Sequence, residues 1–190
     1  DYGNVEFQIA TTEKDYDRFI SAMIDQKRRR YQETGAMDIL SDSKIREFYR
    51  GLRGVIGNRG SVHLSALVIK NNILSTHWGV TYNKRFYFLL PTFSGGAWKK
   101  FSTGRLLQEQ LIEWSIDNGL KIFDFTIGGE QYKKVWCDRE MKVYSSENLI
   151  SVFGIIFFIF HSTKKYLKMN YLTRKYLMKI NSKLIRRYKK

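Results

Sequence analysis

Three short segments rich in apolar and β-branched residues follow one another between residues 61 and 90, with only two residues between each and the next. Both separators contain asparagine, which tolerates the left-handed backbone of two-residue hairpin turns. The chain is therefore predicted to place an antiparallel three-stranded meander at its centre. We expect Pro91 to end the third strand, because proline donates no hydrogen bond to a ladder. The three segments are Ser61 to Lys70, Ile73 to Tyr82 and Arg85 to Leu90.

One strand and two helices are predicted before the meander. The alternating run from Val5 to Ala10 is typical of a strand. Thr12 and Asp15 have the spacing of a capping box, and apolar residues recur after them at helical intervals. A second apolar stripe with the same period follows Ser41. We therefore expect the first third of the chain to fold as a strand followed by two helices.

After the meander the sequence changes to a helix followed by a strand. Thr103 to Asp117 is predicted to be an amphipathic helix, which Asn118-Gly119 ends. Leu120 to Thr126 is apolar enough for a buried strand, parallel to the last strand of the meander. A short helical piece around Lys133 and a strand from Met141 to Ser145 complete the predicted core. The order of these elements predicts a mixed α+β sheet.

Charge divides the chain into two predicted parts. The net charge is +15, but residues 161–190 hold 11 Lys or Arg and no Asp or Glu. The remaining 22 basic residues nearly balance the 18 acidic ones, which leaves +4 on the rest of the chain. We therefore predict a globular domain over residues 1–148 and a helical C-terminal extension over residues 149–190, with any anionic partner bound by the extension.

The extension begins with Leu149 to Phe160, mostly apolar residues that are too few to span a bilayer, which takes about 20 residues in a helix. The stretch from residue 161 to 190 mixes apolar and cationic side chains, as a helix lying on an anionic membrane surface does. A helix that packs on protein with a solvated basic face is the alternative. No specific nucleic acid is expected as a partner, because nothing in this stretch reads bases.

Cysteine use favours the cytoplasm. Cys137 is the only cysteine, so no internal disulfide can form and a reducing compartment is expected. The first residues, from Asp1, lack the charged start and the apolar stretch of a secretion signal. We therefore expect a cytoplasmic protein, peripheral to the inner face of the membrane where the extension binds it. No metal-ligand spacing is present, so no metal is expected.

The segment from Lys99 to Arg105 has the composition of an anion-binding site. It ends at a helix start, where unpaired backbone N–H groups and a partial positive charge can hold a phosphate. Gly104 would let the phosphate approach closely. A normally capped helix beside solvated lysines is the alternative interpretation. The candidate donor-binding residues are Lys100, Ser102, Thr103, Gly104 and Arg105.

Three blocks of the sequence form one pattern of motifs. They are a histidine-containing strand at Ser75 to Val80, a helix start at Ser102 to Leu107, and a run from Asp124 to Trp136 with Asp-Phe, Gly and Tyr-Lys before Trp. This pattern resembles the CelD/BcsL-type acetyltransferases, and the likeness covers Thr12 to Ser145. Two features depart from that family: Thr103 stands where a proline is usual, and the family's longer N-terminal half is absent.

The resemblance implies a GNAT-like fold, that of the acyl-CoA N-acyltransferases. In that fold acyl-coenzyme A lies in a cleft between splayed strands, with its pyrophosphate at the start of the long helix. The implied activity moves an acetyl or other acyl group to an amine or hydroxyl of a saccharide or amine acceptor, in exopolysaccharide or cell-envelope synthesis. Fem-type ligases share the architecture and an aromatic-lysine pair resembling Tyr132-Lys133, so an aminoacyl-tRNA donor is the alternative. A non-catalytic basic module that binds membrane or nucleic acid is a third interpretation.

Acyl transfer needs a base for the acceptor's proton and a donor for the oxyanion that develops on the thioester carbonyl. His77 is a candidate base, with an ordinary pKa of about 6.5, or a hydrogen-bonded histidine inside the sheet. Lys133 is a candidate for steadying negative charge or holding a phosphate. Glu130 is a second candidate base, or a favourable partner of a helix dipole. The candidate substrate-binding residues are Trp98, Tyr132 and Asp124, and we expect Asp124 to orient Lys133 or a loop amide.

Overall fold

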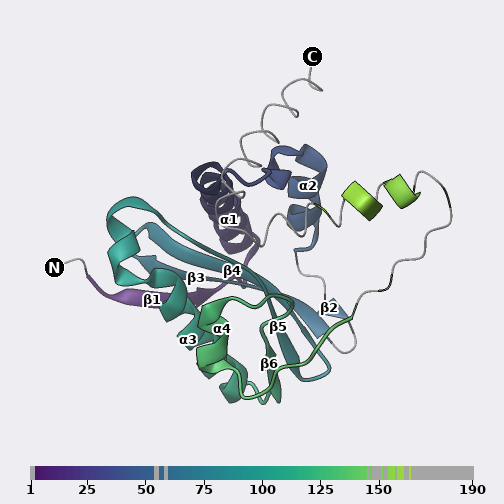
Figure 1. Ribbon diagram of the computed structural model, residues 1–190. Coiled ribbons are helices and arrows are strands. Elements are labelled where there is room, and N and C mark those ends of the chain that lie inside the picture. Colours follow the sequence, from purple (N-terminus) through teal and green to yellow (C-terminus); the bar gives the residue numbers. More distant parts are fainter. Residues whose placement is uncertain are drawn as a thin grey trace. The chain divides into compact units, whose positions relative to one another are not determined.

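The computed structural model describes residues 3–53, 56–57 and 60–144, and beyond them residues 146, 151, 154–156, 158–160 and 163. The chain divides into two compact units, Asp1–Lys134 and Val135–Lys190. The first unit holds the sheet and the helices packed on it (Figure 1). The domain boundary after residue 148, which the charge distribution predicts, stays a prediction.

A mixed sheet of six strands forms the centre of the first unit: β1 (Val5–Ile9), β2 (Ile56–Gly57), β3 (Gly60–Ile69), β4 (Asn72–Tyr82), β5 (Arg85–Phe93) and β6 (Ile122–Asp124). Their order is β1-β3-β4-β5-β6, and β2 pairs with β3 outside this path. β3, β4 and β5 pair antiparallel, which confirms the predicted meander. β6 pairs parallel with β5, which confirms the predicted direction of that strand.

Left-handed backbone closes both hairpins of the meander. Asn83 and Lys84 have φ angles of 48° and 60°, as expected for an asparagine-containing two-residue turn. In the first hairpin the left-handed residue is Lys70, with φ of 53°. The first turn therefore begins one residue earlier than predicted, and β4 begins at Asn72.

Pro91 does not end the third strand of the meander, contrary to the prediction. β5 continues to Phe93, and Pro91 lies opposite His77 of β4. β6 pairs with β5 only from Arg85 to Tyr87. At residue 91 the other edge of β5 therefore has no partner strand within the described part of the chain, and a missing N–H group is tolerated there.

Helices cover both faces of the sheet (Figure 1). α1 (Glu13–Thr34) and α2 (Ser43–Gly51) lie on one face, and α3 (Thr103–Asp117) lies on the other. Successive residues of β3 point to opposite faces: Leu64 packs with α1, whereas His63 contacts Trp114 of α3. The core on the α1 side consists of Tyr16, Phe19, Ile20, Met23, Ile24, Leu64, Ala66, Val68 and Trp78.

The predicted capping box opens α1. The Thr12 hydroxyl accepts from the Asp15 N–H at 3.1 Å, and the Asp15 carboxylate accepts from the Thr12 N–H at 3.2 Å. Gly35, with φ of 65°, ends this helix. Asp42 caps α2 by accepting from the Lys44 N–H at 2.9 Å. The remaining helices are the 3₁₀ helices η1 (Ile39–Ser41) and η2 (Gly96–Phe101) and the short α4 (Gln131–Trp136).

Residues 141–144 form no strand, so the predicted strand from Met141 to Ser145 is wrong over the part of it that the structure describes. Their side chains are exposed, that of Tyr144 by 85%, and alternation without a surface to pack on does not make a strand. Helical residues recur at 154–156, 158–160 and 163. Across the described residues no helix is both long and apolar enough to cross a membrane. Apart from Thr163, the basic stretch 161–190 lies outside the described residues.

Candidate active site

The first residue of α3 ties this helix to the middle of the sheet. Thr103 is buried, and its hydroxyl donates to the Leu74 carbonyl oxygen at 3.3 Å. The Ser75 hydroxyl donates in turn to the Thr103 carbonyl oxygen at 3.0 Å. Leu74 lies where the pairing of β4 with β3 shifts register. The N-terminus of α3 therefore stands on a bulge of β4.

Two backbone N–H groups at the start of α3, those of Thr103 and Gly104, have no hydrogen-bond partner among the residues that the structure describes. The N–H groups of Arg105 and Leu106 both donate to the Ser102 carbonyl oxygen, at 2.8 and 3.2 Å. Ser102 has left-handed backbone with φ of 51°, and its side chain makes no cap hydrogen bond. The N–H groups without a described partner are thus those of the buried Thr103 and the half-buried Gly104, where the 15-residue helix also presents its partial positive charge.

Cationic side chains flank these two amides. Lys99 and Lys100 are exposed, and Nζ of Lys100 lies 4.9 Å from the centroid of the Phe101 ring. Nε of Arg105 pairs with Oε1 of Glu109 at 3.1 Å on the exposed side of α3. The positive charge expected at this helix start is therefore present on both sides of it.

Gly104 stands close to β5 but is not required there by packing. A Cβ atom at this position would come no closer than 3.4 Å to another side chain, at Cδ1 of Phe93, which is an ordinary contact. Its φ angle is not in the left-handed region. An added Cβ at residue 104 therefore fits the protein, so neither packing nor backbone conformation requires a glycine here.

β5 and β6 part beyond their third pair of residues. The last pair joins Tyr87 to Asp124, after which β5 continues to Phe93 toward η2 and α3. At the point of separation the Thr126 hydroxyl, rather than a ladder N–H, donates to the Phe88 carbonyl oxygen at 3.4 Å. This is the strand splay that the predicted position of the donor requires.

Glu130 and Lys133 form a bonded pair at the start of α4. Nζ of Lys133 lies 2.9 Å from Oε2 of Glu130 and donates to the Ile127 carbonyl oxygen at 3.1 Å. Lys133 is only 7% exposed, whereas the side chain of Glu130 is 55% exposed. The hydrogen bond from Lys133 lowers the pKa of Glu130, so this carboxyl is ionised near neutral pH.

His77 is enclosed on the α3 face of the sheet. Its side chain is completely buried and stacks on Phe88, with ring centroids 4.4 Å apart. Neither ring nitrogen has a hydrogen-bond partner in the described part of the protein. Burial, with a contribution from His63, holds the pKa of His77 well below its ordinary value. The ring is therefore neutral at physiological pH, and no acceptor in solvent reaches it in this arrangement.

Asp124 holds two partners, and Lys133 is not one of them. Its Oδ2 pairs with Nη1 of Arg85 at 2.7 Å, and its Oδ1 accepts from the Thr126 N–H at 2.7 Å. The structure thus places Asp124 on a loop amide, one of the two orientations expected for it, and on a guanidinium that the sequence pattern did not indicate.

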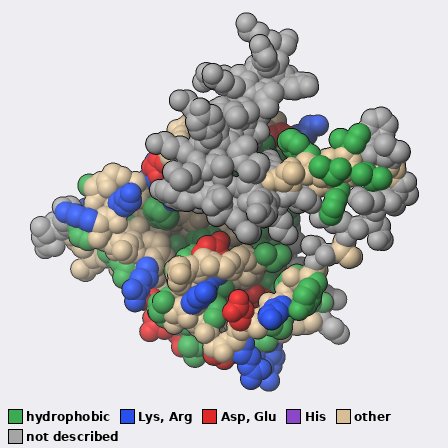
Figure 2. Space-filling model, viewed as in Figure 1, with side chains coloured by type: hydrophobic (Ala, Val, Ile, Leu, Met, Phe, Trp, Pro, Cys, Tyr) green, Lys and Arg blue, Asp and Glu red, His purple; other side chains and the backbone are tan. Residues whose placement is uncertain are grey.

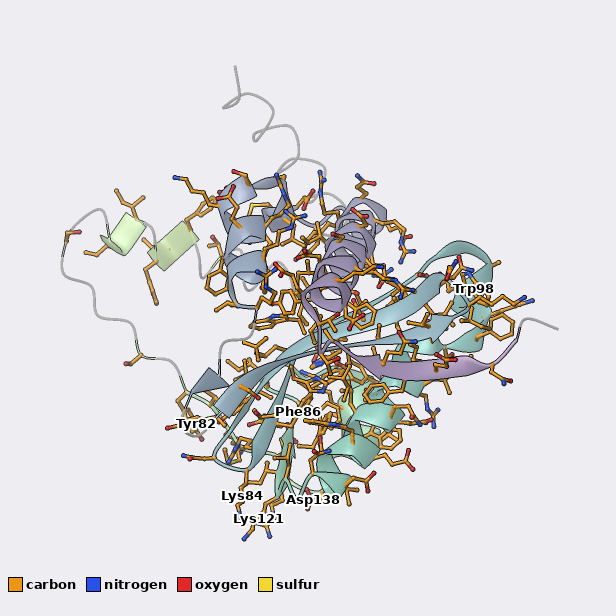
Figure 3. The ribbon with its side chains drawn as sticks, turned by 180° about the vertical axis from the view of Figure 1, so that it is seen from behind. Tyr82, Lys84, Phe86, Trp98, Lys121 and Asp138 are labelled. Atoms are coloured by element: carbon orange, nitrogen blue, oxygen red, sulfur yellow. The ribbon has the colours of Figure 1, made fainter. Side chains whose placement is uncertain are left out.

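The two aromatic candidates for substrate binding lie apart from each other in sequence and surroundings. Trp98 is in η2, just before α3, with its ring centroid 6.0 Å from that of Phe101. Figure 3 shows Trp98 at the opposite end of the sheet from Lys84 and Lys121. Tyr132 is partly exposed on α4, and burial of its ring raises the pKa of its hydroxyl.

Comparison with known proteins identifies the family. Residues 1–134 match the family of acetyltransferase (GNAT) domains. The chain belongs to this family. A GNAT acetyltransferase transfers an acetyl group from acetyl-coenzyme A, so this chain is a transferase and an acyl-CoA is its donor substrate. No curated protein matches the chain significantly.

Solved structures show the same fold at low sequence identity. An aminoglycoside acetyltransferase from an uncultured soil metagenomic sample, in complex with trehalose, is 14% identical with a TM-score of 0.52, and the match covers 77% of this chain and 97% of that one. A possible acetyltransferase from Clostridium difficile 630 is 12% identical with a TM-score of 0.52, covering 76% of this chain and 99% of that one. These likenesses confirm the predicted α+β GNAT-like fold.

In this GNAT domain the candidate residues fall into separate groups. The five donor-binding candidates lie within six residues at the end of η2 and the start of α3, and Glu130 bonds directly to Lys133. His77 lies in the aromatic layer between the sheet and α3, and Asp124 lies at the base of the strand splay. The roles predicted for these residues stay predictions. Within the described residues no group of three or more metal-ligating side chains occurs.

The sequence reasoning missed two residues beside these groups, Arg85 and His63. Arg85 was counted only as the start of a strand, although it pairs with Asp124. His63 is buried against Trp114 and Phe86, with ring centroids 4.3 and 5.2 Å away, and burial lowers its pKa to about 4. No local signal pairs His63 with His77, because the two histidines share a face of the sheet only through the extra residue Leu74, where the pairing of β3 with β4 shifts register.

Proposed function

We propose that this GNAT domain transfers its acetyl group to an amine or hydroxyl of a saccharide acceptor used in exopolysaccharide or cell-envelope synthesis. The single observation that carries the donor half of the proposal is the pair of unpartnered N–H groups at Thr103 and Gly104 on a 15-residue helix. The resemblance of three sequence blocks to the CelD/BcsL-type acetyltransferases supports the acceptor half.

In this proposal the diphosphate of coenzyme A accepts hydrogen bonds from these two amides. Each N–H can donate one hydrogen bond to a phosphate oxygen, and charge-assisted bonds of this kind are stronger than neutral ones. Lys100 adds a mobile cation, and Ser102 adds a hydroxyl that no cap bond occupies. Arg105 can exchange Glu109 for a phosphate, because an exposed ion pair contributes only about 0–1 kcal/mol.

For the chemical step we propose that Glu130 accepts the proton of the attacking amine or hydroxyl. The acceptor atom then bonds to the carbonyl carbon, the carbon–sulfur bond breaks, and the thiolate of coenzyme A takes up the proton that Glu130 releases and leaves as the thiol. Lys133 orients Glu130 through the 2.9 Å contact between them and holds the loop carbonyl of Ile127. His77 was the other predicted base; its complete burial favours a packing role in this proposal.

Coenzyme A binding tests the donor half. We expect coenzyme A and acetyl-coenzyme A to bind the parent protein in isothermal titration calorimetry. Gly104→Asp places a carboxylate at the diphosphate and should abolish binding, whereas the fold, measured by circular dichroism, stays intact. Gly104→Ala is the matched control for the added volume, because its methyl group makes only an ordinary contact with Phe93. Unchanged affinity in Gly104→Asp contradicts the donor site.

The acceptor class has two alternatives with different tests. One structural neighbour is an aminoglycoside acetyltransferase in complex with sisomicin, so amino sugars are the first acceptors to assay with acetyl-coenzyme A. A Fem-type aminoacyl transfer predicts binding of aminoacyl-tRNA instead, which the same calorimetry detects. Transfer to amino sugars without affinity for aminoacyl-tRNA supports the acetyltransferase proposal.

We further propose that the C-terminal extension of a cytoplasmic protein lies on an anionic membrane surface. On the face seen in Figure 2, the described Lys and Arg side chains are scattered in small areas among acidic and apolar ones. The described apolar side chains of residues 149–160 are exposed, and the 11 cations of residues 161–190 follow them in the sequence. Binding to phosphatidylserine vesicles should be lost when residues 149–190 are removed; binding that survives the deletion contradicts this. The exposed apolar residues are Ile155, Ile156, Phe158, Ile159 and Phe160.

A further inference from the structure

We propose that Asp124 is a positioning residue that ends the pairing of β6 with β5 and thereby sets the strand splay in which the donor is placed. This inference rests on the proposed donor site. The residue lies where β5 and β6 separate, at the other end of the proposed site from the α3 amides. The two oxygens of its carboxylate bond to two different partners there.

The two oxygens of Asp124 bond in two directions. Oδ2 pairs with Nη1 of Arg85 on β5 at 2.7 Å, across the ladder that is still formed there. Oδ1 accepts the N–H of Thr126, two residues further along the chain, at 2.7 Å. This second bond is an Asx turn, in which a side chain takes the place of a backbone partner. Asp124 thus secures the last pair of the ladder and turns the next residues away.

The backbone of Thr126, the residue that ends this turn, is left-handed. Its φ angle is 60°, in the left-handed region that a β-branched residue enters only when its surroundings impose it. Its hydroxyl donates to the Phe88 carbonyl oxygen at 3.4 Å. A side-chain bond therefore replaces the ladder bond at the first residue of β5 that β6 no longer pairs.

A specific residue is needed here because the chain after Asp124 could otherwise continue to pair with β5. Beyond Tyr87, β5 runs on to Phe93 with one edge unpaired by any described strand. An extended chain at 125–127 could add to that edge, because unpaired strand edges are templates for pairing. Phe125 would favour such packing, since it already contacts the rings of Phe88 and Phe123. The Asx turn opposes this closure.

Three variants of the full-length protein separate the two bonds of Asp124. Asp124→Asn keeps an oxygen for the Thr126 N–H and loses the ion pair. Arg85→Met also loses the ion pair and leaves the turn intact. Asp124→Ala loses both. Each variant is titrated with coenzyme A by calorimetry, and its melting temperature and the hydrogen exchange of the amides at residues 88–90 and 92 are measured.

We expect Asp124→Asn and Arg85→Met to bind coenzyme A within about twofold of the parent, and Asp124→Ala to bind at least about tenfold more weakly. Amides of residues 88–90 and 92 should exchange more slowly in Asp124→Ala alone, because the ladder closes over them. Affinity equal in all three variants overturns the inference, as does a loss in Asp124→Ala that Asp124→Asn shares in full. Absence of coenzyme A binding in the parent protein instead contradicts the donor site itself.

Discussion

The imidazole of His77 lies where a side chain at Gly79 would have to be. A Cβ atom on Gly79 would come within 2.5 Å of Cε1 of His77 and within 2.5 Å of the Tyr87 carbonyl oxygen. Gly79 is also where the pairing of β4 with β5 shifts register. The absence of a side chain at this bulge is therefore what allows the buried histidine to stack on its aromatic neighbours.

Gly79→Ala is expected to lower the free energy of unfolding by about 2–3 kcal/mol, because the added methyl group meets backbone as well as a buried ring. Urea denaturation followed by circular dichroism measures the change. Gly51→Ala is the matched control: nothing lies within 4 Å of its added methyl group, so its stability should equal or slightly exceed that of the parent. Equal effects of the two substitutions would show that the close contact at Gly79 is relieved at no cost.

Acid should destabilise the protein through its buried histidines. Burial lowers the pKa of His63 to about 4 in the folded state, against an ordinary 6.5. Below pH 6.5 the unfolded chain therefore binds a proton that the folded chain excludes, so stability falls as the pH drops from 6.5 toward 4. His77, shifted in the same direction, adds to the fall.

The expected loss from His63 between pH 7 and pH 5 is about 2 kcal/mol in the free energy of unfolding. Urea denaturation at the two pH values measures it. His63→Leu removes one titrating ring, so the difference between the two pH values should shrink in that variant whatever its absolute stability. A pH dependence that His63→Leu leaves unchanged is the contrary result.

The pair of Glu130 and Lys133 should act as one unit in catalysis. Glu130→Gln keeps an oxygen for the Lys133 ammonium but cannot accept a proton, so we expect kcat with an amino-sugar acceptor to fall by about 10²-fold or more. The KM for acetyl-coenzyme A should change little, because the donor site lies at α3.

Lys133→Met removes the group that orients Glu130 and should also lower kcat. Because Lys133 acts through Glu130, the double variant should be scarcely slower than Glu130→Gln alone. Steady-state rates of the parent and the three variants complete the cycle. If the fall in kcat of the double variant equals the product of the falls in the two single variants, Lys133 contributes to catalysis independently of Glu130.

Most of the fold follows from local signals in the sequence. Thr12 with Asp15, and the turn at Asn83, fix element boundaries through hydrogen bonds and dihedral angles within a few residues. The predicted strand end at Pro91 was wrong because the effect of a proline depends on which edge of β5 is paired, and the distant β6 decides that. The strand predicted from Met141 to Ser145 was wrong because an alternating pattern forms a strand only where a neighbouring strand can pair with it.

The site was predictable only where its parts are contiguous. The start of α3 is a local feature, so its glycine and its cations could be recognised from spacing. The bond of Asp124 to Arg85 joins residues 39 apart, and the enclosure of His77 depends on rings from β5. The sequence shows that such residues are polar or basic. Whether they face solvent or one another depends on packing between distant segments.

The reciprocal hydrogen bonds between Thr103 and the Leu74–Ser75 bulge would connect ligand binding at the start of α3 to the stability of the sheet. Residue 103 has an unpartnered amide N–H, while its side chain and carbonyl are bonded to a central strand. A ligand bound at this amide would therefore be held by a residue that the sheet fixes in place, and fraying of the helix end would not release it. A ligand held this way raises the melting temperature of the whole domain in proportion to the logarithm of its concentration.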